Sequence, residues 1–213
     1  MCGRYYLDFD LLESENFDSK NSIIYETNFN ITPQTKVPIF IENELTIATW
    51  GFFPDWIKNQ KNSKPLFNTR WETVQEKRTF KAAFKKHRCL VPISGWYEWK
   101  NVNDEKQPYF FYKQNELLKA AGLYWLRSSG DIEFSIITKE AEDNLLTIHN
   151  RTPLILNNDS QKLWTSHIDL NNLYSDISKQ KNPSINFHRV SKSVNNPKNT
   201  NSSLINEYTE VPF

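Results

Sequence analysis

The chain has 213 residues, of which 38% are hydrophobic and 14% aromatic, and its formal net charge is +1. So many aromatic residues at so low a charge exclude an intrinsically disordered chain, and the longest apolar runs are too short to span a membrane. The first twenty residues carry five acidic side chains and no apolar stretch, so we expect no secretory signal and a cytoplasmic protein. The two cysteines cannot form a disulfide framework, and no zinc-site spacing occurs, so we expect no metal and no cofactor.

Short strands and short helices alternate along the first two thirds of the chain. A turn at 30–33 precedes a strand at 37–41, which Pro38 marks as an edge strand, and 45–50 is its hairpin partner. Helical spacing of apolar residues predicts an amphipathic helix at 79–86. High β propensity predicts further strands at 89–93, 97–100, 109–112, 120–126 and 134–138.

The remaining elements are sparser. Residues 140–148 are predicted to be helical, another helix begins within 160–166, and the last strand lies at 187–190. The chain after Asn157 is rich in asparagine and interrupted by proline, which predicts loops. No repeat or linker is present, so we expect a single α+β domain over 1–213 with a curved, mainly antiparallel, barrel-like β core. Short helices would lie at its periphery, and a loop-rich tail would begin at about residue 196.

Charge is distributed unevenly along this neutral chain. Residues 70–88 carry a net charge of +5, whereas residues 1–49 carry −5. A basic stretch on a neutral protein indicates either a local anionic partner or a solvated helix face, and the sequence favours neither.

Cys2 follows the initiator methionine. A small second residue permits removal of that methionine, which would leave a terminal cysteine with an α-amine beside its thiol. Such a 1,2-aminothiol condenses with an aldehyde to an imine, and the thiol then closes a five-membered thiazolidine ring. Residue 2 can equally be an accidental cysteine in a frayed terminus.

Two titratable residues stand in suggestive surroundings. Glu98 lies among aromatic residues in Gly-Trp-Tyr-Glu-Trp and shares a strand face with Trp96, which predicts a raised pKa and a proton-shuttling role, or else an exposed edge position. His149 precedes an extended segment set by Pro153, where its imidazole can face a pocket or cap a helix.

A compact polar block and an aromatic block complete the candidates. Asn68 can hold an amine by hydrogen bonding and Arg70 can grip a phosphate, although the block 68–72 also suits a capped helix start with a salt bridge. Trp50 and its aromatic neighbours flank Gly51, and they form either a base-stacking surface or part of the core.

Taken together, these residues resemble one family. The blocks are Met-Cys-Gly-Arg at 1–4, Trp50-Gly51 with Pro54 and Trp56, 68–73, 88–92, 95–99, 148–156 and 190–195. In this order they resemble the SOS response-associated peptidase (SRAP) family of abasic-site processing proteins. Thr152 and Thr69 depart from the family pattern.

The resemblance implies a protein of the SOS and DNA damage response that is associated with the nucleoid when bound to DNA. The sequence leaves the oligomeric state open, and a monomer is the default expectation. Its partner would be single-stranded DNA containing an abasic site, which it would trap as a thiazolidine through lyase-like imine chemistry. By the same resemblance Cys2 would be the nucleophile, Asn68 would position the amine, Glu98 would shuttle protons, and His149 would protonate the sugar oxygen. The residues expected to contact DNA are Arg4, Arg70, Arg151, Trp50, Pro33 and Thr138.

Two other functions use the same residues. The first is a peptidase with Cys2 as an amino-terminal nucleophile, including removal of its own methionine. The second is a non-covalent binder of single-stranded DNA in which Cys2 plays no part.

Overall fold

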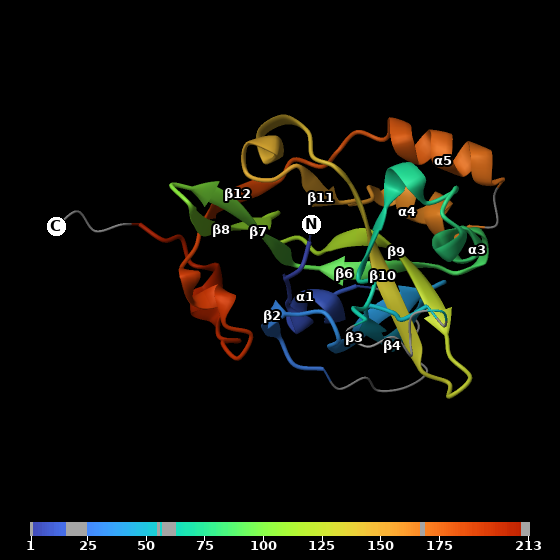
Figure 1. Ribbon diagram of the computed structural model, residues 1–213, viewed down its shortest axis with the longest axis horizontal. Coiled ribbons are helices and arrows are strands. Elements are labelled where there is room, and N and C mark those ends of the chain that lie inside the picture. Colours follow the sequence, from blue (N-terminus) through green and yellow to red (C-terminus); the bar gives the residue numbers. More distant parts are fainter. Residues whose placement is uncertain (1, 16–24, 55, 57–62, 167–168, 210–213) are drawn as a thin grey trace.

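A five-stranded closed barrel forms the centre of the protein in the computed structural model, which describes residues 2–15, 25–54, 56, 63–166 and 169–209 (Figure 1). Around the barrel the strands follow the order β10, β4, β3, β6, β9 and return to β10, with β10 and β4 parallel and the other pairs antiparallel. Their bounds are β3 Lys36–Ile41, β4 Glu44–Trp50, β6 Arg88–Ile93, β9 Leu118–Leu126 and β10 Ile132–Glu140. The expected barrel-like α+β fold is confirmed.

A second, antiparallel sheet lies beside the barrel, in the strand order β12-β8-β7-β1-β2. Two short strands, β5 and β11, pair with β10 outside the barrel. The bounds are β1 Tyr5–Leu7, β2 Asn28–Ile31, β5 Asn68–Arg70, β7 Gly95–Val102, β8 Glu105–Tyr112, β11 Arg151–Pro153 and β12 Asn186–Arg189. One continuous apolar core includes side chains of both sheets, because each turns one alternating face inward.

Short helices lie around these sheets, as Figure 1 shows. The α-helices are α1 Phe9–Glu13, α3 Arg78–Lys86, α4 Asn158–Thr165 and α5 Leu170–Lys179, and the 3-10 helices are η1 Trp71–Thr73, η2 Asp143–Thr147, η3 Lys192–Asn195 and η4 Ser202–Ile205. Helix α3 buries Ala83 and Phe84 and exposes its lysines, as the sequence predicts. Among the described helices none is long and apolar enough to cross a membrane.

Several predicted elements need correction. The helix expected at 140–148 is wrong: β10 continues to Glu140, and only the 3-10 turn η2 follows. β3 is not an edge strand, since it lies between β4 and β6. Pro38 is tolerated there because pairing with β6 involves only Phe40 and Ile41. The asparagine-rich part is less irregular than expected, because α5 runs for ten residues within it.

The segment after β12 is tied to the first strands of the chain. The buried side-chain amide of Asn30 donates to the carbonyls of Val194, Asn196 and Asn199 at 3.2, 3.1 and 2.8 Å. Trp99 of β7 donates from its indole nitrogen to the side chain of Asn195 at 2.8 Å. These contacts hold residues 194–199 against the second sheet.

Candidate active site at the amino terminus

Cys2 lies just ahead of β1, with its side chain 0% exposed. Its Sγ atom lies 3.8 Å from the carbonyl oxygen of Arg4. Burial, with a smaller contribution from the charge of Glu98, raises the pKa of the Cys2 thiol well above its ordinary value. Cys2 is therefore part of the packed structure, and its thiol is held in its protonated form.

Asn68, the first residue of β5, holds the backbone of Cys2. Its Nδ2 atom donates to the Cys2 carbonyl oxygen at 2.7 Å. Within the described part of the chain, its buried Oδ1 atom accepts no hydrogen bond. A buried amide oxygen left in this way is an available acceptor for an N–H group close to the Cys2 backbone.

Glu98 lies on β7 and is only 2% exposed. Strand alternation places it on the same inward face as Trp96, as the sequence predicts. Burial raises the pKa of its carboxyl to about 7. Near neutral pH this group is thus able to give and to take a proton.

His149 follows η2, and its Nδ1 atom lies 3.8 Å from Oε2 of Glu98. The same Nδ1 lies 3.0 Å from the backbone nitrogen of Arg151 and 3.2 Å from its carbonyl oxygen. Because the backbone N–H points at Nδ1, we assign Nδ1 as the acceptor and place the ring proton on Nε2. Burial lowers the pKa of His149, so the imidazole is neutral at physiological pH. Cys2, Asn68, Glu98 and His149 are therefore brought together from four separate parts of the chain.

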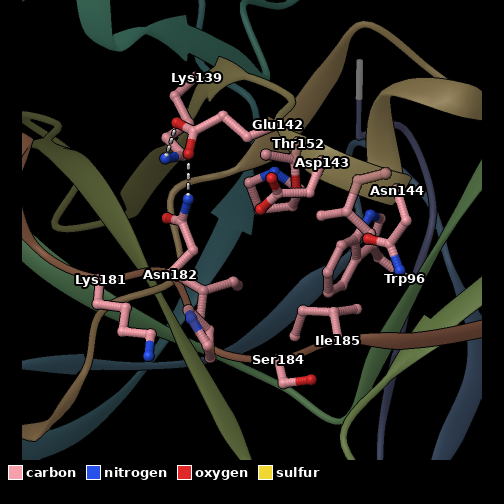
Figure 2. Close-up of a pocket in the computed structure, with 14 residues that line it drawn as sticks. Trp96, Lys139, Glu142, Asp143, Asn144, Thr152, Lys181, Asn182, Ser184 and Ile185 are labelled. Atoms are coloured by element: carbon pink, nitrogen blue, oxygen red, sulfur yellow. Dashed lines mark hydrogen bonds and ion pairs between the residues drawn. The ribbon is translucent and has the colours of Figure 1, made fainter.

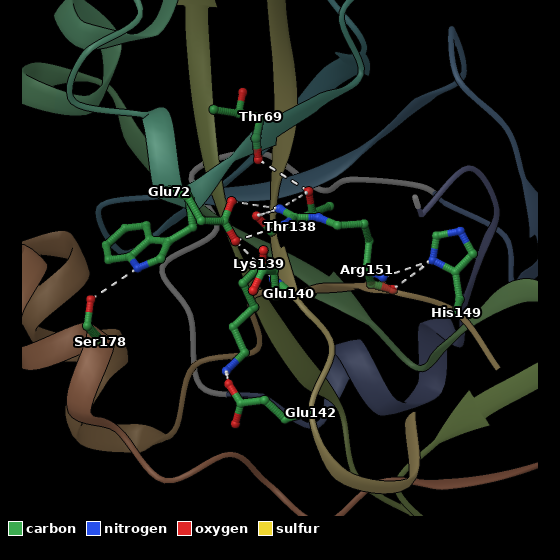
Figure 3. Close-up of polar contacts among 10 residues, drawn as sticks. Thr69, Glu72, Thr138, Lys139, Glu140, Glu142, His149, Arg151 and Ser178 are labelled. Carbon is green, nitrogen blue, oxygen red and sulfur yellow. Dashed lines mark hydrogen bonds and ion pairs between the residues drawn. The ribbon is translucent and has the colours of Figure 1, made fainter. Parts of the chain in front are cut away.

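Arg151 connects His149 to an acidic residue that the sequence did not single out for a role. Its guanidinium donates to Glu72 through Nη1 at 2.8 Å and through Nη2 at 3.0 Å, and also to the carbonyl of Thr138 at 2.7 Å (Figure 3). The side chain is 9% exposed and thus faces the protein. A contact of Arg151 with phosphate stays a prediction, and it would require the guanidinium to exchange partners.

Arg4 is likewise engaged within the protein. Its guanidinium donates to Asn30 Oδ1 at 2.8 Å, to the carbonyl of Val194 at 2.7 Å and to that of Asn195 at 3.3 Å. Arg4, two residues after Cys2, is thereby hydrogen-bonded to residues 194 and 195 near the other end of the chain. Arg4 therefore stabilises the packing of residues 194 and 195 against the start of the chain, whereas its expected contact with phosphate stays a prediction.

The other residues expected to contact DNA differ in accessibility. Arg70 is exposed at the end of β5, and Pro33 is half-buried in the turn before β3. Thr138 is buried in β10 and contacts Arg151. Trp50 is 0% exposed, with its Nε1 donating to the Phe67 carbonyl at 2.9 Å, so it belongs to the core and offers no stacking surface.

Trp56, six residues further on, is the exposed aromatic of that block, with 67% of its surface accessible. It borders a depression that also includes Phe52, Pro54, Arg78 and Trp125. The loop expected around Gly51 lies largely outside the described residues, and Trp50, the member of this stretch expected to stack on bases, ends β4 and is buried.

A separate cavity of about 270 Å³ lies beside the candidate site (Figure 2). Trp96 lines it, and η2, the element preceding His149, forms part of its wall. The carboxylate of Glu142 accepts from Lys139 at 2.7 Å and from Asn182 at 2.6 Å on one side of the cavity. Over the described ranges, no group of three or more His, Cys, Asp or Glu side chains is placed to hold a metal ion.

Sequence reasoning missed two residues of this region. Glu72 was noted only as a possible salt-bridge partner within its own block, and its partner is Arg151, 79 residues away. Asn30 was treated as part of a turn, although it is buried and makes the hydrogen bonds that hold residues 194–199. The side chains alone gave no signal for these distant pairings.

The chain is similar to known proteins over almost its whole length. The family model described as SOS response associated peptidase (SRAP) matches residues 1–197. The protein is 31% identical to the abasic site processing protein YoqW of Bacillus subtilis, over 98% of this chain and 100% of that protein. It is also 31% identical to the abasic site processing protein YedK of Escherichia coli, over 96% and 99% of the two chains.

More distant similarities extend to eukaryotes and to solved structures. The abasic site processing protein HMCES of Xenopus tropicalis is 29% identical, over 86% of this chain and 67% of that protein. A crystal structure of a protein from Bacteroides thetaiotaomicron superposes with a TM-score of 0.84 at 21% identity, covering 98% and 100% of the two chains. The last similarity supports the fold alone.

Proposed function

The chain belongs to the SOS response associated peptidase family, and from that membership we propose that it processes abasic sites in DNA by covalent capture at Cys2. Relatives that share its full length are named abasic site processing proteins. In the form proposed here, the substrate is an abasic site in single-stranded DNA and the product is a thiazolidine cross-link.

The arrangement around Cys2 is the observation that carries the proposal. Asn68 holds the Cys2 carbonyl at 2.7 Å and keeps a buried amide oxygen available beside it. Once Met1 is removed, the α-amine of Cys2 is the N–H group that suits this acceptor. A terminal amine and its own thiol then lie at one centre with a carboxyl and an imidazole.

The reaction needs no side chain beyond those of Cys2, Asn68, Glu98 and His149. The amine nitrogen bonds to the aldehyde carbon of the ring-opened deoxyribose, and loss of one water gives an imine. The thiol sulfur then bonds to the imine carbon, and the thiol proton passes to the nitrogen. The product has the mass of the protein plus the DNA minus one water.

Glu98 and His149 supply the proton transfers. With its pKa raised to about 7, Glu98 can take a proton from the attacking amine and return it to the departing hydroxyl. His149 carries its proton on Nε2 and can donate it to the sugar ring oxygen as the ring opens. Nδ1 of His149 lies 3.8 Å from Oε2 of Glu98, so the two proton carriers lie beside each other at the same centre.

Peptide hydrolysis, the activity in the family's description, is less well supported by the surroundings of Cys2. A cysteine peptidase requires a thiolate, and burial raises the pKa of Cys2 well above its ordinary value. An imine formed on the neighbouring amine is a stronger and nearer electrophile than a peptide carbonyl, so a protonated, buried thiol suits ring closure better.

Intact mass spectrometry tests the proposal. The protein is incubated with a single-stranded oligonucleotide that contains one abasic site, and in parallel with the same oligonucleotide carrying an intact base. We expect loss of Met1 and a stable adduct of protein plus DNA minus water with the abasic strand only. A mature protein without Met1 that yields no adduct would overturn covalent capture.

The same experiment separates the alternatives. Binding to both strands without an adduct would identify a non-covalent DNA-binding protein. Turnover of peptides by a protein that forms no adduct would support the peptidase. An adduct that appears only after borohydride reduction would indicate an imine without ring closure.

A further inference from the structure

Glu72 is connected to His149 by hydrogen bonds that run through Arg151. It lies on η1, directly after β5, and its two carboxylate oxygens accept from the two terminal nitrogens of the Arg151 guanidinium at 2.8 and 3.0 Å. Its Oε1 also accepts the backbone N–H of Glu140 at 3.0 Å. Glu72 thereby joins η1, the end of β10 and β11.

The other end of Arg151 determines the state of His149. Its backbone N–H donates to Nδ1 of the imidazole at 3.0 Å (Figure 3). This bond keeps Nδ1 unprotonated and Nε2 protonated, and it sets the plane of the ring. An arginine held by a two-point ion pair at its tip and by β pairing at its backbone has little freedom to rotate or shift.

From these contacts we propose that Glu72 is a positioning residue of the cross-linking centre: by holding Arg151 it fixes the orientation and tautomer of His149. The catalytic role of His149 in this inference rests on the proposed function. The effect of Glu72 on the tautomer of His149 can be tested independently of that function. Glu72 touches neither Cys2 nor the reacting atoms.

The block 68–72 then serves both halves of the centre. Asn68 at its start holds Cys2, and Glu72 at its end holds the residue that fixes His149. The pKa of Glu72 is lowered by its hydrogen bonds to Arg151, so the carboxylate is charged and the pair is intact at physiological pH.

The sign of the charge change separates an effect on DNA affinity from an effect on the cross-linking rate. Replacing Glu72 with glutamine removes one negative charge close to the centre, which does not weaken the attraction of a polyanion. A loss of rate in this variant is therefore not attributable to weaker DNA binding. Opposite responses of affinity and rate distinguish a positioning role from general damage to the fold.

The matched control is Glu142→Gln. Glu142 also accepts from a cation, Lys139, at 2.7 Å, and lies in the same region (Figure 3), but its bonds do not lead to His149. Both variants lose one negative charge and one ion pair. Only the Glu72 variant loses the contact that holds Arg151.

Single-turnover cross-linking at saturating abasic oligonucleotide is the first measurement. For Glu72→Gln we expect a rate about tenfold or more below that of the native protein, because small displacements of a proton donor are costly. The dissociation constant for the same strand with an intact base should be unchanged or lower. Glu142→Gln should keep the native rate. A native rate in Glu72→Gln, or an equal loss of rate in both variants, overturns the proposal.

The second measurement does not depend on cross-linking. In nitrogen-15 spectra of the histidine rings, native His149 should show a single tautomer with the proton on Nε2, and Glu72→Gln should show a mixture. If the native protein forms no adduct, the proposed function fails while this readout still decides the positioning role. An unchanged tautomer in the variant overturns it.

A more conservative change covers the case in which Glu72→Gln does not fold. Glu72→Asp keeps the charge but draws the carboxylate back by one methylene group, so that it cannot reach both guanidinium nitrogens in the same geometry. Its rate at saturation should fall while its affinity for DNA stays native. A fully native rate in Glu72→Asp counts against the proposal.

Discussion

Nδ1 of His149 lies 3.8 Å from Oε2 of Glu98, so the two titratable groups of the centre form one interacting pair. Burial raises the carboxyl pKa to about 7 and lowers the imidazole pKa below its ordinary value. Near neutral pH the carboxyl therefore titrates, while the imidazole beside it is neutral. This relationship gives the cross-linking reaction its expected dependence on pH.

The first prediction concerns Glu98→Gln. Because glutamine cannot accept or donate the transferred proton, we expect the cross-linking rate to fall about 100-fold and to lose its change in the region of pH 7. The measurement is the single-turnover rate between pH 5.5 and 8.5. Glu105→Gln, which alters an exposed carboxylate paired with Lys192, should keep the native profile. A native profile in Glu98→Gln would exclude Glu98 as the proton carrier.

The second prediction concerns stability. A carboxyl with a pKa of about 7 in the folded protein and an ordinary value of 4.5 when unfolded binds more protons folded than unfolded between these values. The free energy of unfolding should therefore decrease as the pH rises from 4.5 to 7, by on the order of 3 kcal/mol from this group. Urea unfolding at a series of pH values measures it. The decrease should be smaller in Glu98→Gln by that amount, and equal slopes would contradict the raised pKa.

The third prediction separates the amine from the thiol. Cys2→Ala keeps a small second residue and hence a free amine, so an imine can form but no ring can close. We expect no stable adduct without reductant and a trapped adduct after borohydride. Cys89→Ala, which changes the other buried cysteine, should keep the stable adduct despite some loss of stability from the cavity. A stable adduct in Cys2→Ala would exclude the thiazolidine.

The fourth prediction assigns different tasks to two arginines. Arg4→Ala removes three hydrogen bonds to Asn30, Val194 and Asn195 and should lower the free energy of unfolding by about 2–3 kcal/mol. Arg70→Ala, at an exposed position, should leave stability within about 0.5 kcal/mol. It should instead weaken DNA binding and reduce the salt dependence by about 0.7 in the logarithmic slope. Thermal unfolding and binding at several salt concentrations measure both, and the reverse pattern would contradict the assignment.

The fifth prediction compares two tryptophans. Trp56 is 67% exposed, so Trp56→Ala should cost little stability but weaken binding to single-stranded DNA by about 1–3 kcal/mol if bases stack there. Trp50→Ala should destabilise the protein by about 3–5 kcal/mol, because it empties a fully buried site. Unchanged DNA affinity in Trp56→Ala would remove this side chain from the DNA-binding surface.

The sequence predicted local features well. The aromatic neighbours of Glu98 predicted a raised pKa as one of two alternatives, and its burial bears this one out, while helical spacing predicted the buried face of α3. Both predictions rest on residue types that lie close together in the sequence.

The errors concern contacts between distant parts of the chain. Whether Trp50 faces solvent or the core depends on Tyr5 and Phe67, whose rings pack against it. The interior position of β3 depends on β6, which begins 47 residues after β3 ends. The partner of Glu72 lies beyond five intervening strands. Local patterns carry no information about such pairings.

The bond from Arg4 to the carbonyl of Val194 spans 190 positions and has a consequence for synthesis of the protein. At about 5–20 residues per second, a ribosome needs roughly 10–40 seconds to make the chain between these two residues. During that interval nothing from the far end restrains the start of the nascent chain. In the proposed function Met1 is removed, and this interval is time in which an aminopeptidase can act before Arg4 is held by residues 194 and 195. We expect processing to be complete by the time the last residues emerge, so that each finished molecule folds around an amine that is already free.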